Sequence, residues 1–212
     1  MKMTTLSAFY VCSLLSSSVC LAGKGTDISP DLAKPGQLLF EDQFDDAQLG
    51  TTFVAVKGEW KVVDGVVVGN ELATDKHAAV LNCQKKNRNS IVRFSFRLDG
   101  STDGLHLSLN HAKGHLFRVI IAENGMTVRT DADKKDKSIK SELIGQAKGA
   151  FEKGKWYTLQ VEMKGNQVVA ATDNGLKVSG ENVRLDTDKP NYRFVMKGES
   201  LSIDDLKIWS AE

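Results

Sequence analysis

The sequence predicts an almost all-β protein, most simply a two-sheet antiparallel jelly-roll sandwich. From Leu38 onward, short runs of alternating apolar residues are separated by glycine-containing turns at intervals of about ten residues, a pattern typical of antiparallel sandwiches and barrels. No amphipathic helix of useful length is visible. Residues 140–148 are the helix-like exception, and they can equally form a loop between strands.

The strands can be placed one after another along the chain. Residues 38–44 form the first predicted strand, and residues 58–63 and 66–69 form a hairpin over Asp64-Gly65, a dipeptide that supplies the positive φ angles of a tight turn. Residues 90–98 alternate cleanly, which predicts one buried and one wet face. The other predicted strands are residues 105–110, 115–122, a strand from Met126 onward, 156–163, 167–172, 176–178, 192–196 and 201–209.

The hairpin over residues 105–122 has a predictable register. A type I turn with a glycine bulge at Lys113-Gly114 places His111 opposite His115. A slip by one residue would mix apolar with polar groups, so the alternation supports this register. The apolar pairs are then Leu109 with Phe117, Leu107 with Val119 and Leu105 with Ile121.

The first 22 residues have the build of a secretory signal peptide. Lys2 precedes an apolar run over residues 6–15, which is shorter than the roughly 20 residues of a membrane span. Lipidation at Cys20 is the alternative, and it is disfavoured by the polar and bulky residues before this cysteine. We expect cleavage after Ala22 and a secreted or periplasmic location. The expected organisation is a signal peptide over residues 1–22, a tail over residues 23–35 and one domain over residues 36–212.

The composition argues against one class of partner. The chain has 28 basic and 27 acidic residues, and because Lys2 lies in the leader, the mature chain is balanced. A balanced chain without a basic block is not expected to bind nucleic acid, where affinity comes chiefly from phosphate neutralisation. Cys12 and Cys20 also lie in the leader, so Cys83 is left without a disulfide partner. We expect Cys83 to be a small buried hydrophobe and not a nucleophile.

Polar side chains gather on one face of the hairpin over residues 105–122. Planar hydrogen-bonding groups of this kind read sugar hydroxyls or carboxylates, so the face is either a carbohydrate groove or the ordinary solvated side of a sheet. In a groove, arginine and asparagine would hold ligand hydroxyls while a histidine acts as acid or base. The candidate groove residues are His106, Ser108, Asn110, His115 and Arg118, joined by Arg93 and Arg97 if residues 90–98 lie in the same sheet.

Two groups of acidic residues are candidate metal ligands. Glu71 and Asp75 lie shortly before His77, and in a loop these groups can converge on a divalent metal or form an acid and base pair. A lone histidine is more often structural. Acids at the two ends of the domain can bind a structural calcium if the first and last strands are adjacent; otherwise they are solvated edge charges. These acids are Glu41, Asp42, Asp45, Asp46, Asp204 and Asp205.

Several short segments together resemble a known family. They read LLFEDQFD at 38–45, GEW at 58–60, VDGV at 63–66, GKWY at 154–157 and IDDLKIW at 203–209. In these segments the chain resembles the concanavalin A-like lectins and glucanases, most closely the secreted bacterial 3-keto-disaccharide hydrolases, often labelled family 16 glycoside hydrolase-like. Most of these motifs are packing motifs, and Trp60, Trp156 and Trp209 are expected to fill the core.

The resemblance implies a jelly-roll fold and lyase, hydratase or hydrolase chemistry on 3-keto-glycosides. That family usually carries an Asn-Ser-Gly strand and a Gly-aromatic-Glu strand in its groove, whereas residues 105–110 and 114–118 read LHLSLN and GHLFR here, without the glutamate. The paired carboxylates of a glycosidase are also absent from the predicted groove strands.

Three functional hypotheses follow. The first is an exported carbohydrate-associated protein that binds or processes a saccharide in a sheet-face groove. The second is a divergent lyase or hydrolase that uses Glu71, Asp75 and His77 with a metal. The third is a non-catalytic cell-envelope module that binds another protein.

Overall fold

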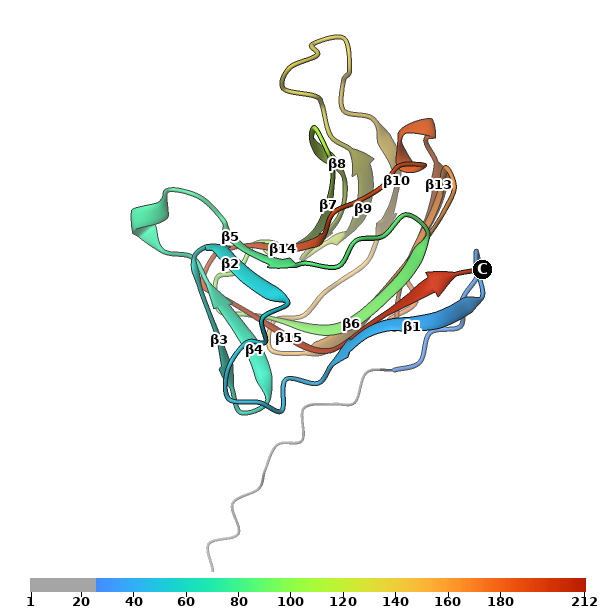
Figure 1. The fold of residues 1–212 in the computed structure, drawn as a ribbon. Coiled ribbons are helices and arrows are strands. Elements are labelled where there is room, and N and C mark those ends of the chain that lie inside the picture. Colours follow the sequence, from blue (N-terminus) through green and yellow to red (C-terminus); the bar gives the residue numbers. More distant parts are fainter. Residues whose placement is uncertain (1–25) are drawn as a thin grey trace, which may run out of the picture.

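Two antiparallel sheets pack face to face in the computed structural model, which describes residues 26–212 (Figure 1). The predicted signal peptide lies outside the described residues. Within residues 26–212, the only helical elements are the short turns η1 (Ala73–Asp75) and η2 (Val183–Leu185), and no helix is long and apolar enough to cross a membrane. The predicted all-β sandwich is therefore confirmed.

Sheet A holds the first and last strands of the chain. Its order is β13-β12-β11-β6-β15-β4-β3, and β1 pairs with the second half of β15. The first and last predicted strands are thus adjacent, which was the condition set for a calcium site at their acids. The strands are β1 (Pro35–Asp42), β3 (Glu59–Val63), β4 (Val66–Asn70), β6 (Ser90–Asp99), β11 (Trp156–Lys164), β12 (Gln167–Thr172), β13 (Lys177–Glu181) and β15 (Ser200–Ala211).

Sheet B has the order β10-β9-β8-β7-β14-β5-β2. Three of its strands, β2, β5 and β10, were not predicted; β2 and β5 are each a run of only five residues without clear alternation. The helix-like stretch over residues 140–148 contains the edge strand β10. The strands are β2 (Phe53–Lys57), β5 (Ala79–Cys83), β7 (Gly104–His111), β8 (Gly114–Ala122), β9 (Gly125–Thr130), β10 (Leu143–Lys148) and β14 (Tyr192–Lys197).

The core between the sheets is filled by the inward residues of the alternating strands. Phe94 of β6 meets Phe194 of β14 edge to face, with ring centroids 5.0 Å apart, and this pair joins the two sheets. Cys83 is fully buried, and burial raises the pKa of its thiol to about 12, so it is a hydrophobic core residue as predicted.

The tryptophan prediction was right for one residue of three. Trp60 is buried and packs over Gly69, where a Cβ would lie 2.4 Å from the indole ring. Trp156 and Trp209 are only partly buried. They project from the outer face of sheet A because the inward positions beside them are taken by Tyr157 and Ile208.

The predicted register of the β7–β8 hairpin holds for its apolar pairs and fails at the turn. Leu109 pairs with Phe117 as predicted, but Asn110 pairs with His115, and His111 pairs with Gly114. The turn contains only two residues, and the register shift lies inside the hairpin between Leu109 and Asn110, not at the turn. The change moves His115 beside Asn110.

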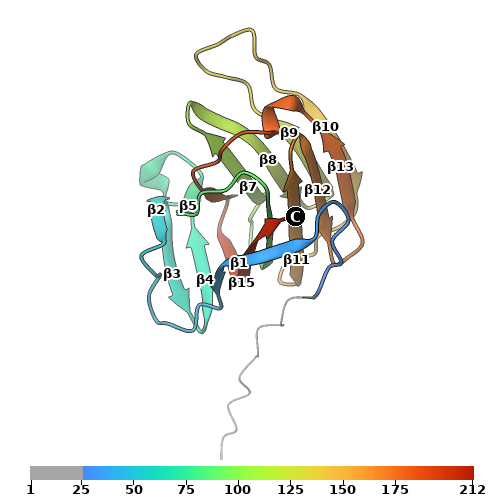
Figure 2. The same ribbon diagram turned by 45° about the vertical axis from the view of Figure 1, so that its right-hand side comes forward.

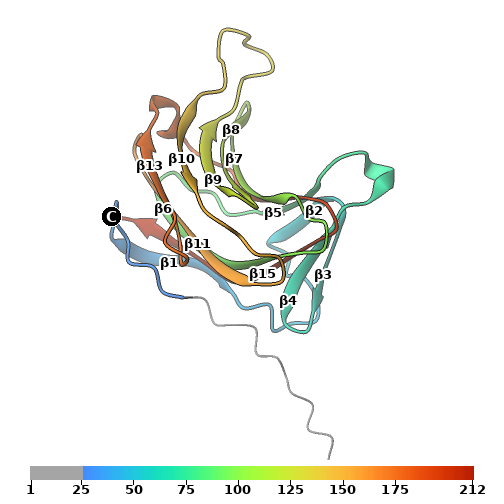
Figure 3. The same ribbon diagram turned by 180° about the vertical axis from the view of Figure 1, so that it is seen from behind.

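Sheet B curves so that its outer face is concave. In Figure 1, β5, β14, β7, β8 and β9 form a curved wall whose hollow side points away from sheet A. The loop between β9 and β10 and the loop that carries η1 stand at the two ends of this wall, and the view from behind shows the same arrangement (Figure 3). The outward residues of sheet B therefore lie on this concave face, which we call the hollow.

Residues 26–34 lie against the outer face of sheet A and do not form a free tail, as Figure 2 shows for the segment that leads into β1. Glu162 of β11 is 1% exposed, and its carboxylate accepts hydrogen bonds of 2.8–3.1 Å from the backbone N–H groups of residues 31–33. The Asp27 carboxylate pairs with Arg93 at 2.7 Å. Residues 26–34 of the predicted tail thus form a strap over sheet A.

Candidate functional site

A row of polar side chains crosses the concave face of sheet B. The register aligns one outward residue from each of five neighbouring strands, so the side chains stand side by side. With about 4.8 Å between strands, the row is about 19 Å long. From β5 to β9 it consists of Asn82, Arg193, Ser108, Arg118 and Arg129.

Beside the row, His106 stands in a more apolar environment. It is aligned with Val195 on β14 and with Ile120 on β8. Burial, followed by the nearby Arg118 charge, lowers the pKa of His106 to about 4. His106 is therefore a neutral imidazole near pH 7, with one donor and one acceptor nitrogen.

Arg193 contacts three polar side chains on the concave face. Its Nε donates to Asn82 Oδ1 at 3.2 Å, and its Nη1 lies 3.1 Å from His115 Nδ1 and 3.5 Å from Asn110 Oδ1. His115 Nδ1 also lies 3.0 Å from Asn110 Oδ1, so the tautomer of the ring decides whether Nδ1 donates to Asn110 or accepts from Arg193. Burial, followed by the Arg193 charge, lowers the pKa of His115, in agreement with a neutral ring.

Arg118 is held by a carboxylate at the end of β9. Its Nη2 lies 2.5 Å from Asp131 Oδ1 and its Nε donates to Oδ2 at 3.2 Å, so the pair is bidentate. Arg184 donates from Nη1 to the Asp131 carbonyl at 2.8 Å. Within residues 26–212, Asp131 is the single carboxylate that is paired with a member of the row.

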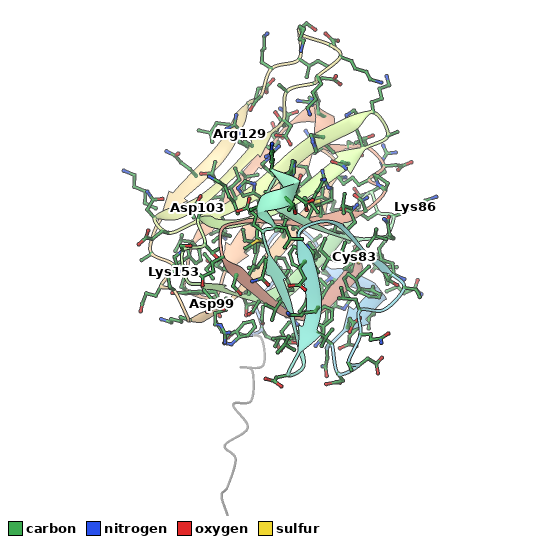
Figure 4. All side chains as sticks on the ribbon, turned by 90° about the vertical axis from the view of Figure 1, so that its left-hand side faces the viewer. Cys83, Lys86, Asp99, Asp103, Arg129 and Lys153 are labelled. Carbon is green, nitrogen blue, oxygen red and sulfur yellow. The ribbon has the colours of Figure 1, made fainter. Side chains whose placement is uncertain are left out.

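A basic pocket of about 410 Å³ opens at the β8–β9 end of the row. Arg129 lies in it, and Figure 4, turned so that η1 comes forward, labels this residue above η1. Both Nε and Nη2 of Arg129 donate to the Ser141 hydroxyl. The pocket is lined by His115, Arg118, Ile120, Arg129, Asp131, Ala132, Lys134 and Ser141.

A larger cavity, of about 780 Å³, lies beyond the β7–β8 turn. Its lining mixes basic and acidic side chains, including His111, that come from four segments of the chain. Arg88 there is already paired with Asp186 at 2.9 Å and with Asp188 at 3.7 Å. We place the candidate site on the concave face because its polar groups stand on neighbouring strands and keep free donors.

Two predicted groove residues lie elsewhere. Arg93 and Arg97 belong to β6, which pairs with β11 and β15 in sheet A, so they are on the opposite side of the sandwich from His106. Each stacks on an indole, Arg93 on Trp209 and Arg97 on Trp156, with 5.1 Å between guanidinium and ring centroid. The prediction failed because alternation gives the face of a strand and not the sheet that it joins.

Two of the residues predicted as metal ligands, Glu71 and Asp75, instead accept hydrogen bonds from the backbone of neighbouring loops. Asp75 accepts from the backbone N–H of Gly58 at 2.6 Å, and Glu71 accepts from that of Gly198 at 2.7 Å. His77 is exposed, and its Nδ1 lies 2.7 Å from the Ala78 carbonyl oxygen. In the described part of the chain, no three His, Cys, Asp or Glu side chains are grouped so that they could hold a metal.

The acids at the two domain ends come together because β1 and β15 pair. Burial, with added repulsion from neighbouring carboxylates, raises the pKa of Asp42 and of Asp204. Glu41 and Asp205 both lie within ion-pair distance of Lys207, at 3.3 and 3.0 Å. Within residues 26–212, these acids also do not form a group of three or more ligands that could hold a metal.

The concave face contains residues that the sequence analysis did not select. Arg193 and Asn82 were missed because β5 was not predicted and because nothing in the sequence places β14 beside β7. Arg129 and Asp131, at the end of β9, were missed because the strand from Met126 onward was predicted without a pairing partner. The alternation around Arg193, between the buried Tyr192 and Phe194, was the available signal.

Comparisons with known proteins give a fold and no family. No protein-family model and no curated protein matches the chain. Among solved structures, the carbohydrate-binding module CBM66 from Bacillus subtilis matches with a TM-score of 0.61 and 11% identity, over 76% of this chain and 96% of the module.

Two glucanase structures match to a similar degree. SCLam, a non-specific endo-β-1,3(4)-glucanase from family GH16, has a TM-score of 0.60 and 10% identity, covering 85% of this chain and 95% of its own. A variant of LamA from Z. galactanivorans, in complex with laminaritriose and laminaritetraose, has a TM-score of 0.63 and 11% identity, covering 84% of this chain and all of its own. The chain therefore has the concanavalin A-like jelly-roll fold of these proteins.

Proposed function

We propose that this protein is exported and binds a saccharide on the concave face of sheet B. The observation that carries the proposal is the row from Asn82 to Arg129, which aligns amide, hydroxyl and guanidinium groups over about 19 Å of a hollow sheet face. Such groups bind hydroxyls, and the row is long enough for an oligosaccharide. Val195 and Ile120 beside the row offer apolar contacts to the C–H faces of sugar rings.

The site is better suited to binding than to glycoside hydrolysis. Hydrolysis by the usual route needs two carboxylates that flank the scissile bond. Asp131 is engaged by Arg118 in a bidentate pair, and no second carboxylate is paired with the row within residues 26–212. General acid catalysis needs a pKa near the working pH, whereas the pKa of His106 is about 4.

The saccharide class includes 3-keto-glycosides as candidates, because the packing motifs of the sequence resemble the family that acts on them. Export is supported by the leader-like residues 1–22. Calcium at the β1–β15 acids remains a prediction, to be tested with the same assay.

Thermal unfolding against a panel of ligands tests the proposal. The purified protein is heated with neutral and acidic oligosaccharides, 3-keto-glucosides, and calcium with an EDTA control. A ligand that binds the native state raises the midpoint by mass action. We expect a shift with at least one saccharide, and its loss in His106→Ala and in Arg118→Ala.

The control is Arg97→Ala, which removes an arginine from the outer face of sheet A and should leave the shift intact. If no saccharide shifts the midpoint, the carbohydrate proposal is wrong. The envelope module that binds another protein then becomes the better description, and exposed apolar residues such as Val54 and Val56 would be the place to look for its surface.

A further inference from the structure

The arginines of this protein divide into two groups by their partners. The sequence has seven arginines. Four of them form ion pairs with carboxylates: Arg88, Arg93, Arg97 and Arg118. Over residues 26–212, the three without a carboxylate partner are Arg129, Arg184 and Arg193, and Arg129 and Arg193 belong to the polar row while Arg184 contacts Asp131.

The guanidinium groups of the row also keep free donors. Arg118 uses Nε and Nη2 on Asp131, Arg193 uses Nε and Nη1 on its neutral neighbours, and Arg129 uses Nε and Nη2 on Ser141. Among the described residues, one terminal nitrogen of each has no hydrogen-bond partner. Each free nitrogen is a charged donor on the concave side, the geometry with which arginine binds carboxylate or sulfate oxygens.

The positive charges are close together and poorly compensated. Arg118 and Arg129 are directly paired across β8 and β9, so their Cα atoms are about 5 Å apart. Lys134 adds a third cation to the same pocket, against the one carboxylate of Asp131, which Arg118 already occupies. Burial and the Arg118 charge both lower the pKa of Arg193. An anion in the pocket would relieve this repulsion.

We propose that the saccharide bound by the concave face is anionic, and that a carboxylate or sulfate group of one sugar unit occupies the basic pocket between Arg118, Arg129 and Lys134. This inference rests on the proposed function and makes it specific. The rest of the sugar chain lies along the row toward Asn82, where the neutral histidines and amides bind hydroxyls. The overall charge balance of the chain hides this local excess.

The pocket itself is tested first, without a need to know the full ligand. Sodium glucuronate and sodium sulfate are titrated into the purified protein at constant ionic strength, with glucose as the neutral control, and the arginine Nε–H signals are followed by NMR. We expect saturable shifts for Arg118 and Arg129 with either anion and none with glucose. Absence of a saturable shift with both anions overturns the inference. A response to only one of them tells whether a uronate or a sulfated sugar is the better fit.

Matched oligosaccharides then separate this inference from the proposed function. Oligogalacturonate is compared with its methyl ester, and a sulfated galactan oligosaccharide with its desulfated form, by calorimetry. We expect the acidic member of at least one pair to bind at least about tenfold more tightly, with an affinity that falls as salt rises. Arg129→Gln should remove this preference while Arg97→Gln keeps it.

The outcomes are distinguishable. Neutral members that bind as tightly as acidic ones leave the proposed function standing and overturn the anionic assignment. If no oligosaccharide binds and glucuronate moves no signal, both are wrong. If a DNA oligonucleotide binds as tightly as the acidic saccharides, the face is a general polyanion surface and the saccharide assignment is overturned.

Discussion

The two outer faces of the sandwich carry similar side chains but differ in the partners of those side chains. Both present arginines: Arg93 and Arg97 of β6 on sheet A, and Arg118 of β8 and Arg193 of β14 on sheet B. On sheet A, each arginine has a carboxylate partner and an indole beneath it. On sheet B, Arg193 has only neutral partners. Composition alone therefore does not identify a binding face; the partners of each charge do.

The strap supplies the carboxylate partner of Arg93. Residues 26–34 cover part of sheet A and bring Asp27 to Arg93, while the buried Glu162 holds the strap by three backbone N–H groups. No segment in the described part of the chain covers sheet B in this way, and its two long loops stand at the ends of the hollow (Figure 1). Part of sheet A is thus covered by the protein itself, whereas the described residues leave the outer face of sheet B uncovered.

The largest expected effect concerns the closed face. Glu162→Ala removes the acceptor of three N–H groups, each of which costs about 1–3 kcal/mol if it stays buried and unpaired. Because the strap can partly detach into water, we expect a loss of about 3 kcal/mol in the free energy of unfolding, measured with urea. Glu181→Ala, at an exposed site, is the control and should change stability by less than about 0.5 kcal/mol. Equal effects would show that the strap is not held by Glu162.

The second effect concerns the pH dependence of the open face. The pKa of His106 is about 4 in the folded protein and near its ordinary value of 6.5 in the unfolded chain. As pH falls below about 6.5, the unfolded chain takes up this proton first, so stability decreases until about pH 4 and then levels off. We expect His106→Asn to abolish on the order of 2 kcal/mol of this loss.

The matched control for this experiment is His77→Asn, at an exposed histidine, which should follow the wild-type pH profile. The measurement is urea unfolding at a series of pH values between 4 and 7.5. Identical slopes for wild type and His106→Asn would show that His106 is not desolvated, and the neutral-histidine description of the hollow would be wrong.

The third effect compares one arginine from each face. Arg193→Gln removes one guanidinium donor of the row, and we expect the affinity for the bound saccharide to fall about tenfold, or about 1.4 kcal/mol. Arg93→Gln removes an arginine of sheet A and should change this affinity by less than about twofold. Calorimetry with the ligand from the thermal panel measures both. Comparable losses in the two variants would contradict the assignment of the site to sheet B.

The smallest effect tests how the strap is held. Lys177 pairs with Asp31 at 2.7 Å, but the two side chains are 51% and 45% exposed. Exposed ion pairs contribute little, so Lys177→Met should lower stability by no more than about 0.5 kcal/mol. A loss as large as that of Glu162→Ala would mean that surface charge, and not the buried carboxylate, fixes the strap.

The sequence predicted the strands with clear alternation and most of the polar set on β7 and β8. Residues 90–98 and the hairpin over residues 105–122 were placed correctly because inward Phe and Leu residues alternate with polar ones. His106, Ser108, Asn110 and Arg118 were correctly predicted to share one face. Their proposed roles in catalysis or binding remain predictions.

The pairing of distant strands was beyond the sequence. Strand β14 lies between β7 and β5, although more than 80 residues separate it from either along the chain, and alternation carries no information on that choice. For this reason Arg193 was missed, and Arg93 and Arg97 were joined to the wrong face. The strap was interpreted as a tail because its partner, Glu162, lies 129 residues or more away in the chain.

The most direct test of the account is an NMR titration of the purified protein with the saccharide that gives the largest thermal shift. The account predicts that backbone amide signals of β14, β7, β8 and β9 move saturably, with the largest changes around Arg193 and Arg118, while those of β6 and β11 stay still. Changes centred on β6 and β11, or spread evenly over both sheets, would contradict the assignment of the saccharide site to the concave face of sheet B.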